Sequence, residues 1–144
     1  MKTKLNFNKT ILNLLIAVFF LSASFELTAQ EKKSADLKDF KIVVEKTDNG
    51  IKMKCIEGSA WIDLSFSQNN NKPQAIDEYG MTELNKVSLN KDPKISDFLF
   101  TLTKTEKGIS LKGIEGTAWT ELSFGLLRNN QRQAINQLGM ASLN

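Results

Sequence analysis

Hydrophobic and polar side chains alternate along three short stretches in the first half of this chain. The stretches cover residues 40–44, 51–55 and 60–66, and in each of them apolar residues recur at every second position. A period of two places alternate side chains on opposite faces of an extended backbone, so each stretch is predicted to be a half-buried β-strand. A fourth apolar segment covers residues 74–81, and its pattern fits either a strand or a short helix ended by Gly80.

Turn-forming residues separate these stretches. Residues 48–50 (Asp-Asn-Gly) join the first two stretches, Gly58 stands before the third, and residues 69–71 (Asn-Asn-Asn) follow it. Glycine adopts positive φ angles without steric cost, and asparagine tolerates them better than most residues, so tight connections between antiparallel strands are predicted here. The asparagine turn favours a strand over a helix for residues 74–81, because it suits a hairpin.

The whole pattern occurs twice. Residues 39–66 align with residues 97–124 without a gap and are identical at 15 of 28 positions. Residues 69–85 align with residues 128–144 after a one-residue insertion and are identical at 9 of 17 positions. An internal repeat of this size predicts two copies of one supersecondary unit.

The two copies are expected to fold as one domain. The first copy covers residues 39–85, the second covers residues 97–144, and residues 86–96 link them. A unit below about 50 residues is too small to bury a core of its own, so the copies should share one. The sequence therefore predicts an all-β fold of two tandem four-stranded antiparallel meander repeats, packed as one pseudo-twofold sandwich or barrel.

The N-terminal residues have the layout of a secretory signal peptide. Three lysines among the first nine residues precede an apolar run over residues 11–25, and Ala29 supplies a small residue for cleavage. The run is shorter than the ~20 residues of a membrane-spanning helix. We expect residues 1–29 to be a signal peptide and residues 30–38 a flexible lead-in. The abundant Lys, Asn and Ile suit a bacterial protein, secreted or periplasmic; a retained N-terminal membrane anchor is the alternative.

The net charge gives little support to nucleic-acid binding. The whole chain has 19 basic and 16 acidic side chains, a net charge of +3. Residues 1–29 contain three lysines and one glutamate, so the exported chain would keep 16 and 15, a net charge of +1. Binding to nucleic acid or to an anionic membrane depends on excess positive charge. We therefore expect no nucleic-acid partner, and no membrane span after signal cleavage.

Side chains used in catalysis and metal binding are scarce. The chain has no histidine and one cysteine, Cys55. Histidine-based nucleophilic catalysis and the usual zinc sites are thereby excluded. Cys55 is expected to be a small buried residue, and an intermolecular disulfide is the alternative. Paired carboxylates, as glycosidases use them, recur as Glu57 with Asp63 and as Glu115 with Glu121. Glu57 and Glu115 stand beside turn glycines, which suits a solvated surface. We predict no catalytic residue, no metal and no cofactor.

The third strand of each copy carries the candidate binding residues. By strict alternation these residues share one face of the strand: Trp61, Asp63 and Ser65 in the first copy, and Trp119, Glu121 and Ser123 in the second. An exposed indole offers a flat apolar surface, and its polar neighbours would orient a sugar ring or a peptide. The alternative is a bulge after the preceding glycine, which would turn each indole into the core for packing alone.

These observations predict a small secreted, non-enzymatic binding module for glycan or protein. Recognition would use the tryptophan strands or a sheet edge, and two copies would allow bivalent binding. One alternative is a structural or assembly component of the bacterial envelope that acts through edge-strand pairing. The other is an enzyme inhibitor or a glycan-acting enzyme. The sequence identifies neither the ligand nor the oligomeric state.

Overall fold

Ten β-strands make up the part of the chain that the structure describes. The structure is a computed structural model, and it describes residues 36–69, 71–86 and 89–144. Among these residues no helix is long and apolar enough to cross a membrane. The predicted signal peptide over residues 1–29 and most of the predicted lead-in lie outside the described residues. The all-β prediction is confirmed.

Each sequence copy contributes five strands. Those of the first copy are β1 (Lys41–Lys46), β2 (Gly50–Glu57), β3 (Asp63–Ser67), β4 (Pro73–Asp77) and β5 (Gly80–Thr82). Those of the second copy are β6 (Leu99–Lys104), β7 (Gly108–Glu115), β8 (Glu121–Gly125), β9 (Arg132–Asn136) and β10 (Gly139–Ala141). Equivalent strands have equal lengths, which are 6, 8, 5, 5 and 3 residues in each copy.

The fourth predicted segment, residues 74–81, folds as a hairpin of two strands. The carboxylate of Asp77 accepts hydrogen bonds from the backbone N–H groups of Tyr79 and Gly80, at 2.8 and 3.0 Å. In the second copy the side-chain oxygen of Asn136 makes the two equivalent bonds. Such a side-chain-to-backbone turn reverses the chain within two residues. The segment is extended and not helical, but the prediction of four strands per copy is wrong.

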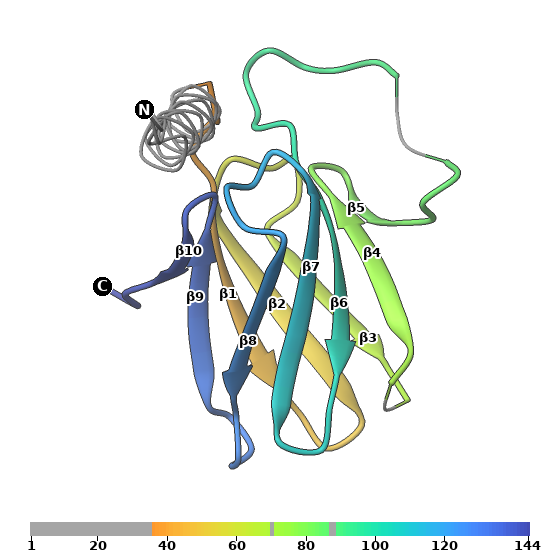
Figure 1. Cartoon of the computed structure of the whole chain (residues 1–144), viewed down its shortest axis with the longest axis vertical. Coiled ribbons are helices and arrows are strands. Elements are labelled where there is room, and N and C mark those ends of the chain that lie inside the picture. The colour runs from red at the N-terminus through yellow and green to blue at the C-terminus, as the bar shows by residue number, and fades with distance from the viewer. Residues whose placement is uncertain (1–35, 70, 87–88) are drawn as a thin grey trace, which may run out of the picture. The chain divides into compact units, whose positions relative to one another are not determined.

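The ten strands form two five-stranded antiparallel sheets, and the two copies exchange strands between them (Figure 1). The first sheet has the order β10-β9-β1-β2-β3, and the second has the order β5-β4-β6-β7-β8. Only the first three strands of each copy form a meander. The last two pair onto the other copy, β4 with β6 and β9 with β1, so the predicted four-stranded meander is also corrected. Neither sheet closes on itself.

An asparagine turn carries the chain from the first sheet to the second. Asn71 has a φ angle of 66°, and its N–H donates to the carbonyl of Lys104 at 3.0 Å. The buried side chain of Gln68 accepts from the N–H of Lys104 at 3.0 Å and donates to the carbonyl of Leu102 at 2.9 Å. The exchange gives β1 and β6 a hydrogen-bonded neighbour on each side, which satisfies their backbone groups.

The inward faces of both sheets form one buried cluster. Ile42 and Val44 of β1 are fully buried, as are Phe100 and Leu102 of β6. The remaining fully or largely buried apolar members are Phe40, Ile51, Met53, Cys55, Trp61, Ile76, Phe98, Ile109, Leu111, Trp119, Leu126 and Ile135. The rings of Phe40 and Phe98, which are equivalent in the two copies, have centroids 4.6 Å apart. Because both copies contribute to this cluster, the hydrophobic stabilisation of each depends on the other.

Two equivalent lysines reach from a strand end to the hairpin turn of the other copy. Nζ of Lys104 donates to the carbonyl of Asp48 at 2.7 Å, and Nζ of Lys46 donates to the carbonyl of Glu106 at 2.8 Å. Lys104 is buried, whereas Lys46 is half-buried. We expect Lys104→Met to lower the free energy of unfolding by about 1–3 kcal/mol, because it removes a charged donor and keeps the apolar stem.

Urea denaturation of Lys104→Met, with Lys46→Met as the matched comparison, measures this effect. Lys46→Met, at the more exposed position, should lower the free energy of unfolding by less than Lys104→Met does. Wild-type stability of Lys104→Met would contradict a stabilising role for this contact.

Candidate functional site at two open sheet edges

The two tryptophans predicted to bind a ligand lie in the interior. Trp61 and Trp119 are 9% and 8% exposed, and the Trp119 ring lies 5.9 Å from that of Phe100. The indole N–H of Trp61 donates to the carbonyl of Asp77 at 3.0 Å, and that of Trp119 donates to the carbonyl of Asn136 at 2.9 Å. Asp77 belongs to the second sheet, whereas the strand that follows Trp61, β3, belongs to the first. Asn136 belongs to the first sheet, whereas the strand that follows Trp119, β8, belongs to the second. This burial corresponds to the packing alternative and not to an exposed indole surface.

A local break in the alternation explains the inward indole. Gly58 has a φ angle of 92°, and a Cβ atom added there would lie 2.6 Å from a neighbouring backbone carbonyl oxygen. Behind this glycine, the hydroxyl of Ser59 donates to the carbonyl of Trp61 at 2.7 Å. Trp61 then points inward, while Ile62, which is 68% exposed, and Asp63 both point outward. Two successive outward residues shift the pattern by one position, as a bulge does.

The polar residues predicted beside the tryptophans lie on the surface. Asp63 and Ser65 are exposed on β3 of the first sheet, and Glu121 and Ser123 are exposed on β8 of the second. The structure therefore brings each carboxylate together with its hydroxyl neighbour and separates both from the indole. Whether these four side chains contact a ligand stays a prediction.

β3 is an edge strand with outward-directed backbone groups. The carbonyl of Ile62 accepts from β2, and the N–H of Gln68 donates to the turn before β2. Hydrogen bonds alternate along an antiparallel pair, so the even-numbered residues of this strand face β2. The N–H and C=O groups of Asp63, Ser65 and Ser67 consequently point away from the sheet, where the described structure contains no further strand.

β8 presents the same edge in the second sheet. The carbonyl of Thr120 accepts from β7, and the N–H of Leu126 donates to the turn before β7. By the same alternation, the backbone groups of Glu121, Ser123 and Gly125 point outward. The other two edges, β5 and β10, are only three residues long. β3 and β8 also contain no lysine or proline, the residues that commonly protect an edge from pairing.

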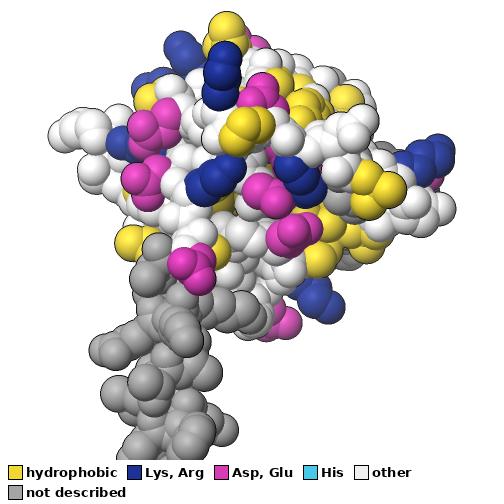
Figure 2. Space-filling view, turned by 90° about the horizontal axis from the view of Figure 1, so that it is seen from above, with side chains coloured by type: hydrophobic (Ala, Val, Ile, Leu, Met, Phe, Trp, Pro, Cys, Tyr) yellow, Lys and Arg dark blue, Asp and Glu magenta, His cyan; other side chains and the backbone are white. Residues whose placement is uncertain are grey.

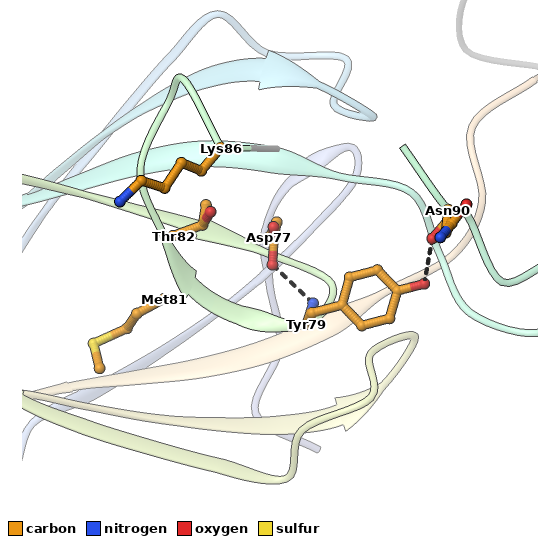
Figure 3. A pocket seen from close by; sticks show the side chains of 6 residues that line it. All are labelled: Asp77, Tyr79, Met81, Thr82, Lys86 and Asn90. Carbon is orange, nitrogen blue, oxygen red and sulfur yellow. Dashed lines mark hydrogen bonds between the residues drawn. The ribbon is translucent and has the colours of Figure 1, made fainter. Parts of the chain in front are cut away.

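A hollow of about 440 Å³ lies at the β4–β5 hairpin, and Figure 3 shows its lining residues. Tyr79 extends across it, and its hydroxyl donates to the carbonyl of Asn90 at 3.0 Å. The same hydroxyl accepts from the N–H of Asp92 at 3.2 Å. This tyrosine therefore joins the hairpin to the linker between the copies, which is a structural role.

A second hollow, of about 730 Å³, lies on the outer face of the first sheet. Its lining includes Asp63 and Ser65 together with four further charged residues, Glu45, Lys52, Lys54 and Arg132. Strand pairing arranges these residues in two rows, which are Arg132–Glu45–Lys52–Ser65 and Val43–Lys54–Asp63. Among the described residues, neither an ion pair nor a side-chain hydrogen bond engages any of these charged groups.

The second sheet differs at the equivalent positions. Its row beside Ser123 contains Ser110 and Thr103, where the first sheet has Lys52 and Glu45. The hydroxyl of Ser123 donates to that of Ser110 at 3.3 Å. The two outer faces therefore share a backbone arrangement and differ in charge.

Sequence reasoning missed a buried carboxylate at the turn between β4 and β5. Glu78 is 2% exposed, its Oε1 lies 3.4 Å from Nζ of Lys91, and its Oε2 has no hydrogen-bond partner among the described residues. Lys91 also pairs with Asp97. Burial lowers the pKa of Lys91, but its bond to Asp97 and the charge of Glu78 outweigh this, so that pKa is raised.

The second copy carries an amide at the matching position. Gln137 accepts from the N–H of Phe40 at 3.2 Å and donates to the carboxylate of Asp39 at 2.6 Å. In the second copy the uncharged amide therefore bonds the aspartate directly. In the first copy Lys91 bridges Glu78 and the equivalent aspartate, Asp97. The Glu-to-Gln difference between aligned positions was the sequence signal for this site.

The described residues include the carboxylates considered for catalysis and the single cysteine. They contain no group of three or more histidine, cysteine, aspartate or glutamate residues placed to hold a metal ion. Burial raises the pKa of the Cys55 thiol, which donates to the carbonyl of Glu57 at 3.0 Å. Of the carboxylates considered for catalysis, Asp63 and Glu121 lie on different sheets.

Comparison with known proteins adds no assignment. No protein family, curated protein or solved structure matches this chain. The function is therefore inferred from the residues at the open edges.

Proposed function

We propose that this protein is a non-enzymatic binding module that holds an extended segment of another protein at its open sheet edges. The observation that carries this proposal is the pair of five-residue edge strands, β3 and β8, with outward-directed backbone groups and no protecting lysine or proline. A strand added at such an edge would satisfy those backbone groups. The signal-like N-terminus supports action in the periplasm or outside the cell.

A protein segment suits the site better than a glycan does. Sugar rings are commonly recognised by an exposed aromatic face, and both tryptophans are buried. The described residues that line the 730 Å³ hollow beside β3 include no aromatic side chain. Unpaired charges next to an open strand instead suit the backbone and side chains of an extended peptide.

The surface charge supports a protein partner over nucleic acid. Figure 2 shows acidic and basic side chains interspersed with apolar ones over the face that it draws. Nucleic-acid binding favours a continuous basic surface. The near-neutral charge expected after signal cleavage points the same way.

We further propose that the two copies pack as a pseudo-twofold sandwich. Equal strand lengths and equivalent tryptophan hydrogen bonds support such an axis. The axis would relate the β3 edge to the β8 edge and allow one molecule to hold two segments at once.

The test is selection of displayed random 12-residue peptides on the purified protein. We expect enriched peptides to bind wild type and Ser65→Ala/Ser123→Ala, and to lose at least tenfold in affinity for Ser65→Pro/Ser123→Pro. Proline removes an outward N–H at each edge, whereas the β2 and β7 ladders do not use that group. Ser65→Lys/Ser123→Lys is a second blocking variant, and circular dichroism checks that each variant folds.

Peptides that bind the wild type and both blocked variants equally would refute edge pairing. A glycan array probed in parallel separates the ligand classes, and binding to glycans without binding to peptides would refute a protein ligand. Assembly of this chain with itself is the second candidate, because β3 and β8 have equal lengths and each is centred on a serine. Sedimentation velocity would detect this self-assembly as oligomers that form in the wild type and in the serine-to-alanine control but not in the blocking variants.

A further inference from the structure

We infer that the β3 edge selects its partner strand by the order of two charged side chains, an acidic one opposite Ser65 and a basic one opposite Asp63. This inference rests on the proposed pairing of a protein segment with β3.

The geometry of the edge sets which partner residues matter. The backbone groups of Ser65 and Asp63 point toward the position of an added strand, and their side chains are exposed on the outer face of the first sheet. The two partner residues opposite these positions would be separated by one residue in the partner strand. Both of their side chains would therefore lie on the outer face of the first sheet. All strand pairs of the two sheets are antiparallel. An antiparallel partner would therefore read acidic-x-basic from its N-terminus.

The row that ends at Ser65 favours an acidic neighbour. Arg132, Glu45 and Lys52 follow one another across β9, β1 and β2, so their charges alternate in sign. Ser65 is small and uncharged, and strands lie about 4.8 Å apart, so the long Lys52 side chain can extend over it toward an added strand. An acidic side chain there would continue the alternation.

The row that ends at Asp63 favours a basic neighbour. Asp63 is exposed, it stands directly at the edge, and within the described structure its carboxylate has no ion-pair partner. Opposite charges on directly paired residues stabilise a sheet, and like charges destabilise it. A segment in the reverse order, basic-x-acidic, would place its carboxylate against Asp63 and its cation near Lys52.

The β8 edge provides an internal comparison. The position equivalent to Lys52 is Ser110, and the position equivalent to Glu45 is Thr103. Without a lysine beside Ser123, this edge has no cation to select an acidic residue at that place. Glu121, the equivalent of Asp63, would still favour a basic residue opposite it, so the preference for this charge order is expected to be stronger at β3 than at β8.

Two nine-residue peptides of equal composition test the inference. Both alternate threonine and valine, and they differ only in whether the central triplet is Glu-x-Lys or Lys-x-Glu. Fluorescence anisotropy with the Ser123→Pro protein, in which only β3 is open, should give about three- to tenfold tighter binding of the Glu-x-Lys peptide. Lys52→Glu/Asp63→Asn should reverse the preference without placing a lysine on the β3 edge, and added salt should weaken the preference.

Lys52→Ser, which copies the second sheet, should reduce the ratio of the two affinities without changing the fold. Equal affinities for the two peptides, unchanged by the charge reversal, would overturn the charge order. In that case edge pairing would stand if Ser65→Pro abolished binding of both peptides. Binding of neither peptide to the open β3 edge would overturn the charge order, and the library selection would decide separately on the proposed function.

Discussion

Replacing Trp61 by alanine is expected to lower the free energy of unfolding by about 3–5 kcal/mol, and replacing Trp119 should have a similar effect. Each substitution removes a large side chain from the cluster that both sheets share. It also leaves a carbonyl, that of Asp77 or that of Asn136, without its indole donor. A loss of this size is a large part of the total stability of an ordinary domain.

Phenylalanine at the same positions separates packing from hydrogen bonding. Trp61→Phe keeps an aromatic ring and loses the N–H, so we expect a smaller loss of about 1–3 kcal/mol. Ile62→Ala is the matched surface control, because Ile62 is 68% exposed, and it should change stability by no more than about 0.5 kcal/mol.

Urea denaturation measures these differences, and tryptophan emission gives a second readout. In single-tryptophan proteins the emission should be blue-shifted and resistant to acrylamide. Red-shifted, readily quenched emission together with near-wild-type stability of Trp61→Ala would show that the indole faces water.

The alternating pattern was sufficient to predict the first two strands of each copy. The side chains assigned to the inner face of residues 40–44 and 51–55 are all buried in β1 and β2 or just before β1. The prediction works because a central strand of a sheet has one face on the core throughout its length, so burial follows the period of two.

The alternating pattern does not predict the burial of the tryptophans. Alternation counted backwards from Ser65 places the indole of Trp61 on the outer face, because it takes no account of the break at Ile62. That break depends on the positive φ angle of Gly58 and on its close approach to the backbone before β1. A glycine in the sequence allows such a conformation but does not specify it. The same alternation did place Asp63 and Ser65 on the surface, since no break follows them.

The strand exchange could not be predicted from local pattern at all. β4 pairs with β6 and β9 pairs with β1, across large separations in sequence. Residues 73–77 would need the same alternation whether they paired beside β3 in the first sheet or beside β6 in the second. Their sequence therefore carries no signal that separates the two placements. Contacts such as those of Gln68 with β6 decide between the two, and they appear only in the folded chain.

Replacing Gln137 by glutamate should destabilise the protein by about 2–4 kcal/mol at neutral pH. Gln137 is buried and donates to the carboxylate of Asp39, so a carboxylate in its place would set two negative charges against each other. In the first copy the equivalent pair, Glu78 and Asp97, is bridged by Lys91. Within the described residues no lysine forms an ion pair with Asp39, the residue equivalent to Asp97.

The deficit of Gln137→Glu should shrink as the pH falls. Burial and the charge of Asp39 would raise the pKa of the new carboxyl group in the folded state above its value of about 4.3 in the unfolded chain. An acid with a raised folded-state pKa destabilises the fold above that pKa and ceases to do so once it is protonated in both states. Urea denaturation over this pH range should therefore bring the variant toward the wild type at acidic pH. A deficit independent of pH would point to lost packing and not to charge.

Glu78→Gln is the reverse exchange, and we expect it to be neutral or stabilising by about 1 kcal/mol. The new amide would donate to Asp97 as Gln137 donates to Asp39, and it would replace the unpartnered Oε2.

Lys91→Met should cost about 2–4 kcal/mol in the wild type, where it leaves two carboxylates side by side, and less than about 1 kcal/mol in the Glu78→Gln background. The double-mutant cycle measures this coupling. Equal effects of Lys91→Met in both backgrounds would mean that the lysine stabilises the linker by some contact other than its bridge between the two carboxylates.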